Sequence, residues 1–80
     1  MEENKELLKK VEAALFISAR FMPVDEMVML TNINPIMLSD LLKELQARYA
    51  EEDSALVIVN KDNLWKMNVK PEYQNIMTRL

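Results

Sequence analysis

The stretch NPIMLSDLLKELQARYAEEDSALVIVNKDNLWKMNV, residues 34–69, decides the fold because it joins an amphipathic helix to a β-hairpin. Apolar residues in its first half recur at the helical spacing i, i+3, i+4, i+7 and i+11, at Leu38, Leu41, Leu42, Leu45 and Tyr49. Asn34 followed by Pro35 is typical of an N-cap and a first helical position. We therefore predict a helix that begins at Pro35 and ends in the acidic run 51–53.

The second half of the stretch predicts two antiparallel strands. Residues 54–60 are rich in β-branched side chains, and residues 64–69 alternate between apolar and polar. The chain has no Gly, so Asp62 and Asn63 are expected to supply the left-handed conformation of the turn between the strands. Alternation places one set of side chains on the core face, namely Leu56, Ile58, Trp65, Met67 and Val69.

Two more helices are predicted before this stretch. Residues 5–19 carry an apolar stripe at helical spacing, at Leu7, Leu8, Val11, Ala14, Leu15 and Ser18. A short helix should follow from Val24, directly after Pro23, with its inward side chains being Val24, Met27 and Leu30. Residues 31–34 then form a tight connection, as in a helix-turn-helix. Three helices followed by a two-stranded wing give a winged helix-turn-helix, so the predicted fold class is α+β, mainly α.

The sequence after the wing predicts the start of a fourth helix. Pro71 suits a first helical position, and apolar residues follow at helical spacing, at Tyr73, Ile76, Met77 and Leu80. This stripe is still running at Leu80. We expect residues 1–70 to form the winged-helix domain and residues 71–80 to begin a connecting helix that leads to a second winged-helix domain.

Composition argues against catalysis. The chain has no His, no Cys and no Gly, so the usual general base, the thiolate ligands of zinc and the Gly-rich phosphate loops are all missing. No hydroxyl has a nearby activating base in the sequence pattern. We therefore predict a non-enzymatic protein with no metal, cofactor or small-molecule site, and no apolar run is long enough to span a membrane.

The predicted recognition helix is a poor reader of DNA. The chain carries 13 acidic and 10 basic residues, for a net charge of −3, whereas DNA affinity comes mainly from basic side chains that neutralise phosphates. The charges along this helix cancel, at Asp40, Lys43, Glu44 and Arg48. Its first turn offers mainly apolar side chains, which cannot read the donor and acceptor pattern of base edges.

The wing differs because three basic residues lie close together there, Lys61, Lys66 and Lys70. Lysines on an edge strand commonly keep that strand soluble. A weak, non-specific phosphate contact is the alternative interpretation, so we expect DNA binding to be weak and non-specific at most.

The sequence supplies more apolar residues than one small core requires, and three groups are candidates for a protein interface. The groups are Val57, Val59 and Leu64 on the outer face of the wing, Ile36 and Met37 at the start of the third helix, and Phe16, Phe21 and Met22 near the end of the first. Seven methionines add adaptable apolar surface. We expect self-association or partner contact through one of these groups.

Four segments resemble the N-terminal domain of the segregation and condensation protein B family. They are VEAALFIS (11–18), PVDEM (23–27), LLKELQARY (41–49) and LWKMNVKPEY (64–73), of which the last is the most specific. The family usually has Ser-Gly after the first helix, glycines in the wing turn, and acidic residues at the positions of Ile36 and Met37. This chain has Ser18-Ala19 and Lys61-Asp62-Asn63 instead, which is typical of a divergent member and consistent with an archaeal one.

This resemblance implies a non-catalytic subunit of two tandem winged-helix domains. Such a subunit binds a kleisin, a ScpA-like protein, which bridges an SMC ATPase in the complex that condenses and segregates prokaryotic chromosomes in the cytoplasm. It also implies that the N-terminal domain contributes to a homodimer. Two alternatives stay open from the residues alone: a DNA-binding winged-helix transcriptional regulator, and a winged-helix scaffold of the transcription apparatus.

Overall fold

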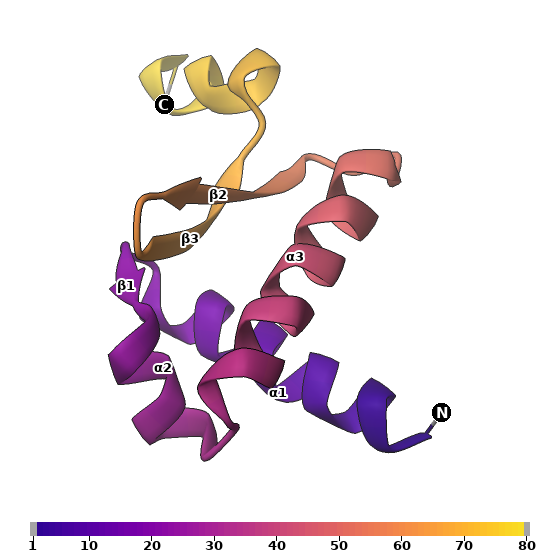
Figure 1. Cartoon of the computed structure of the whole chain (residues 1–80). Coiled ribbons are helices and arrows are strands. Elements are labelled where there is room, and N and C mark those ends of the chain that lie inside the picture. Colours follow the sequence, from indigo (N-terminus) through magenta and orange to yellow (C-terminus); the bar gives the residue numbers. More distant parts are fainter. Residues whose placement is uncertain (1, 80) are drawn as a thin grey trace.

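The computed structural model describes residues 2–79 and the side chains of residues 4–76. Its elements follow the order helix, strand, helix, helix, hairpin and 3-10 helix (Figure 1): α1 Glu2–Ser18, β1 Met22–Pro23, α2 Val24–Thr31, α3 Pro35–Glu51, β2 Leu56–Lys61, β3 Leu64–Val69 and η1 Pro71–Arg79. The predicted fold class is confirmed: three helices precede a β-hairpin, as in a winged helix.

Helix α3 lies at the centre of the core. Its four leucines are all buried, and the Asn34 side chain caps its first turn by accepting the backbone N–H of Ile36 at 2.8 Å. Helices α1 and α2 pack on one side of α3, and β2 packs on another. The α1 stripe is confirmed too, because Leu8, Val11 and Leu15 are buried against α3 or its neighbours.

The sheet has three strands, in the order β1-β3-β2, with both pairings antiparallel. The predicted alternation of the hairpin is confirmed, because Ile58 and Trp65 are buried on its inner face. Strand β1 was not predicted, since a two-residue strand has no periodicity and Pro23 suits a helix start equally well. Met22 pairs with Trp65, and the Val24 N–H donates to the Asn63 carbonyl at 3.2 Å, so β1 ties the start of α2 to the wing.

Three turns place a residue other than Gly in the left-handed region. The backbone φ is 52° at Ala19, 58° at Asn32 and 58° at Asp62. The expectation for the wing turn is correct for Asp62 and wrong for Asn63, which does not have a positive φ. Asn and Asp tolerate this conformation, but the Cβ of Ala19 crowds its backbone at a cost of about 1 kcal/mol.

Helix η1 begins at Pro71 as predicted, but it is a 3-10 helix. Its start is fixed to the wing, because the Lys70 N–H donates to the Ala55 carbonyl at 2.7 Å and the Gln74 side chain donates to the Val69 carbonyl at 2.8 Å. Tyr73 and Ile76 are exposed, so the stripe does not join the core. The predicted positions Met77 and Leu80 lie outside the side chains that the structure describes.

A polar contact joins α1 to α3 at the edge of the core. The Tyr49 hydroxyl donates a hydrogen bond to the Glu12 carboxylate. This bond, together with burial and the nearby acidic charges, raises the pKa of Tyr49 from 10.0 to about 12. The phenol is therefore held in its neutral, donating form by the folded state.

This contact predicts a specific loss of stability in alkali. A pKa raised by folding stabilises the protein fully below the unfolded value of about 10, and the contribution is lost as the pH rises through about 12. We expect the free energy of unfolding, measured in urea at about pH 8 and about pH 11, to fall more in the wild type than in Tyr49→Phe. Tyr73→Phe is the matched control and should follow the wild type; an equal fall in all three proteins would contradict the account.

The left-handed Ala19 predicts a stabilising substitution. Ala19→Gly removes the Cβ that crowds the backbone and should raise the free energy of unfolding by about 0.5–1 kcal/mol. The same change at Ala47, which is exposed in the interior of α3, should lower it by about 1 kcal/mol. Chemical denaturation of both variants checks this, and a destabilised Ala19→Gly would show that the position carries no strain.

Candidate protein-interaction surfaces

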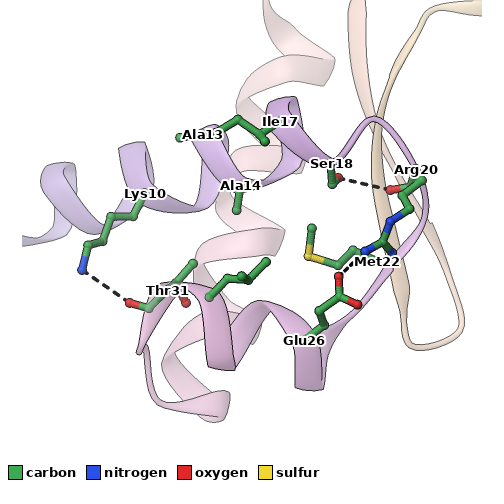
Figure 2. Close-up of a pocket in the computed structure, with 10 residues that line it drawn as sticks. Lys10, Ala13, Ala14, Ile17, Ser18, Arg20, Met22, Glu26 and Thr31 are labelled. Carbon is green, nitrogen blue, oxygen red and sulfur yellow. Dashed lines mark hydrogen bonds and ion pairs between the residues drawn. The ribbon is translucent and has the colours of Figure 1, made fainter.

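An apolar groove of about 550 Å³ runs between α1 and α2. Figure 2 shows α1 along one wall and α2 along the other. The lining of the groove includes Ala14 and the buried Met22, and it also includes Ile17 and Leu30, whose surfaces are 79% and 64% exposed. Exposed aliphatic side chains around a concave surface are typical of a site that another protein covers.

Charged side chains mark the two ends of this groove (Figure 2). At one end, the Lys10 ammonium donates to the Thr31 carbonyl at 3.4 Å and so links α1 to α2. At the other end, Arg20 forms an ion pair with Glu26 and also donates to the Phe21 carbonyl at 3.2 Å. The groove is therefore apolar along its length and polar at its ends.

Sequence reasoning missed this groove because it placed Leu30 in the core. In the structure Met27 is buried as predicted, but the other buried residue of α2 is Thr31 and not Leu30. Thr31 can be buried because its hydroxyl donates to the Met27 carbonyl at 2.6 Å and accepts the Ile33 N–H at 3.3 Å. With its polar group satisfied, Thr31 takes the inward position and Leu30 turns to the surface. Ile17 carried no distinguishing signal, since it lies outside the α1 stripe.

The outer face of the wing brings together the three residues predicted there. Val57 pairs with Asn68, Val59 with Lys66, and Lys61 with Leu64, which puts Val57, Val59 and Leu64 on one face. All three are half-buried, and polar side chains stand opposite each of them. Each apolar side chain of this surface is therefore paired with a polar one across the hairpin.

The start of α3 exposes the second predicted group. Ile36 is 77% exposed and Met37 is also exposed, next to the Asn34 cap. Farther along the helix, Glu44 and Arg48 form an ion pair at 2.6 Å, so the basic charge is balanced within the helix. The exposed surface of α3 therefore offers apolar contact and little net charge to a nucleic acid.

The third predicted group does not stay together. Phe16 is exposed on α1, but Met22 is buried in the core, so its prediction as a surface residue is wrong because β1 draws it inward. Phe21 is half-buried, and the Lys66 ammonium lies 5.7 Å from the centre of its ring. Lys66 is thus engaged in a cation–π contact.

The wing lysines are only partly free to meet phosphates. Lys66 lies over Phe21, and the Lys70 ammonium donates to the Glu52 carbonyl at 3.0 Å. Lys61 is exposed in the strand before the turn. Two of the three predicted phosphate contacts therefore have roles within the fold.

Neither metal nor membrane features were found in the described part of the chain. Residues 2–79 contain no group of three or more acidic, His or Cys side chains placed to hold a metal ion. Within the same range, no helix combines the length and the apolar character that crossing a bilayer requires.

Comparison with known families identifies the chain. The family model for segregation and condensation complex subunit ScpB matches residues 9–80, which is nearly the whole sequence. The chain belongs to the ScpB family. A solved structure described as a dimer of a ScpB N-terminal domain complexed with a ScpA peptide is similar in fold, with a TM-score of 0.85 over 100% of this chain and 93% of that chain. The two sequences are 18% identical. Comparison with curated protein sequences gives no match.

The groove and the wing both lie within the residues that match the ScpB family. The matched residues 9–80 include all of α2, α3 and the sheet, and the part of α1 that lines the groove. The candidate surfaces are therefore parts of the ScpB fold itself.

Proposed function

We propose that the chain is a non-catalytic, kleisin-associated subunit of a prokaryotic SMC complex that acts in chromosome condensation and segregation. The observation that carries the proposal is the match of the ScpB family model to residues 9–80. The similar solved structure contains a ScpA peptide, so a ScpA-like kleisin is the proposed partner, and the kleisin connects the subunit to the SMC ATPase. We place this activity in the cytoplasm, at the nucleoid.

Self-association is the second part of the proposal. The similar structure is a dimer, and this chain exposes large apolar side chains that a small monomer would have to leave in water. Residues 1–70 form the domain that would carry these contacts, and residues 71–80 would lead to a second winged-helix domain. The charge balance of α3 and the engaged wing lysines support a protein partner over a DNA duplex.

Affinity purification tests the proposal directly. The tagged protein, expressed in its own cell and purified from a nuclease-treated lysate, should recover a kleisin and an SMC ATPase. Lys61→Gln combined with Lys66→Gln is the matched control, because these changes remove wing charge and leave α3 and the groove intact. We expect this variant to recover the same partners at similar yield.

Two results would contradict the proposal. Absence of the kleisin from the wild-type purification would remove the proposed partner. Loss of all partners on nuclease treatment, or in the wing-lysine variant, would favour a DNA-dependent regulator in its place.

A further inference from the structure

We propose that the α1–α2 groove is the dimer interface, and that it pairs with the same groove of a second copy around a two-fold axis. This inference rests on the self-association in the proposed function and names the surface that produces it. In such an interface the same patch serves both copies, so the patch must be complementary to itself in shape and in charge. The groove meets both requirements.

The groove has both the projecting side chains and the hollows that helix packing requires. Ala13 and Ala14 are small and leave a hollow along α1, whereas Ile17 projects one turn farther along. Leu30 projects from the facing wall on α2. A two-fold axis that crosses the groove places α1 of each copy against α1 of the other, so Ile17 of each copy fills the hollow at the alanines of the other, and Leu30 of each copy packs against α2 of the other.

The charges at the groove ends are also complementary to themselves. Lys10 lies at one end and Glu26 at the other (Figure 2). A two-fold axis across the middle exchanges the ends, and Lys10 of each copy then meets the Arg20–Glu26 ion pair of the other and can bond the Glu26 carboxylate from the side opposite Arg20. Arg20 bonds Oε2 of Glu26, and no described residue of the chain bonds Oε1, so the carboxylate can accept a second cation.

This distribution of charge favours a second copy over a peptide. Recognition of a charged peptide commonly uses a rim of the opposite sign, whereas this groove has Lys10 at one end and the Arg20–Glu26 ion pair at the other, so its rim is of mixed sign. The wing is the weaker candidate for the dimer, because Val57, Val59 and Leu64 are half-buried and Lys66 occupies the same face in both copies. Two like charges facing each other would oppose that arrangement.

Charge exchange tests the pairing with the 80-residue chain. In a Lys10→Glu homodimer the new carboxylate meets the free side of Glu26 at each end, where Arg20 is already bonded to the other side. In a Glu26→Lys homodimer two ammonium groups and Arg20 meet with no carboxylate between them. Each variant alone should therefore associate at least about tenfold more weakly than the wild type in sedimentation equilibrium. An equimolar mixture restores an opposite-charge pair at both ends, and its affinity should return to within about threefold of the wild type.

Matched variants keep the test specific. Lys43→Glu makes the same charge change on the exposed surface of α3, and Val57→Glu with Leu64→Glu changes the wing; both should associate as the wild type does. Circular dichroism melts check that each variant is folded, and recovery in the mixture cannot arise from misfolding.

The outcomes separate this inference from the proposed function. The groove pairing is overturned if both single variants associate with the affinity of the wild type, or if their mixture stays monomeric. Self-association itself stands in either case. A wild-type chain that is monomeric at every concentration overturns both self-association and the groove pairing, and it leaves the kleisin purification as the remaining test of function.

Discussion

Four buried leucines of helix α3 pack against α1 and α2 on one side and lie near Ile58 of the sheet on another, so one helix organises the whole core. They are Leu38, Leu41, Leu42 and Leu45. A chain of 80 residues can bury only a limited share of its surface. Helices α1 and α2 each pack one face against α3, and large apolar side chains on their other faces stay exposed, among them Ile17, Met29 and Leu30. The groove between them is a consequence of this arrangement.

Strand β1 connects that core to the groove. Met22 is buried beside its partner Trp65, and it also lines the groove. Because β1 holds the start of α2 to the wing, and Lys10 links α1 to the end of α2 at Thr31, both ends of the groove are fixed by contacts within the chain. A surface held in this way loses little conformational entropy when it binds, which favours association.

The sequence predicted those parts of the structure that depend on local periodicity and capping. The α3 stripe, the Asn34 cap and the alternation of the hairpin were all predicted correctly, and the segment LWKMNVKPEY pointed to the family. Strand β1 was missed because its pairing with β3 joins residues more than 40 positions apart. The groove was missed because the choice between Thr31 and Leu30 for the inward side depends on hydrogen bonds that only the fold supplies.

Methyl NMR of the 80-residue chain across a concentration series tests the central claim most directly. The account predicts that the methyl signals of Ala13, Ile17 and Leu30 shift together as the protein concentration rises, while those of Val57, Val59 and Leu64 stay constant. Shifts confined to the wing residues would contradict the account. So would groove methyl signals that do not shift at concentrations where the chain associates.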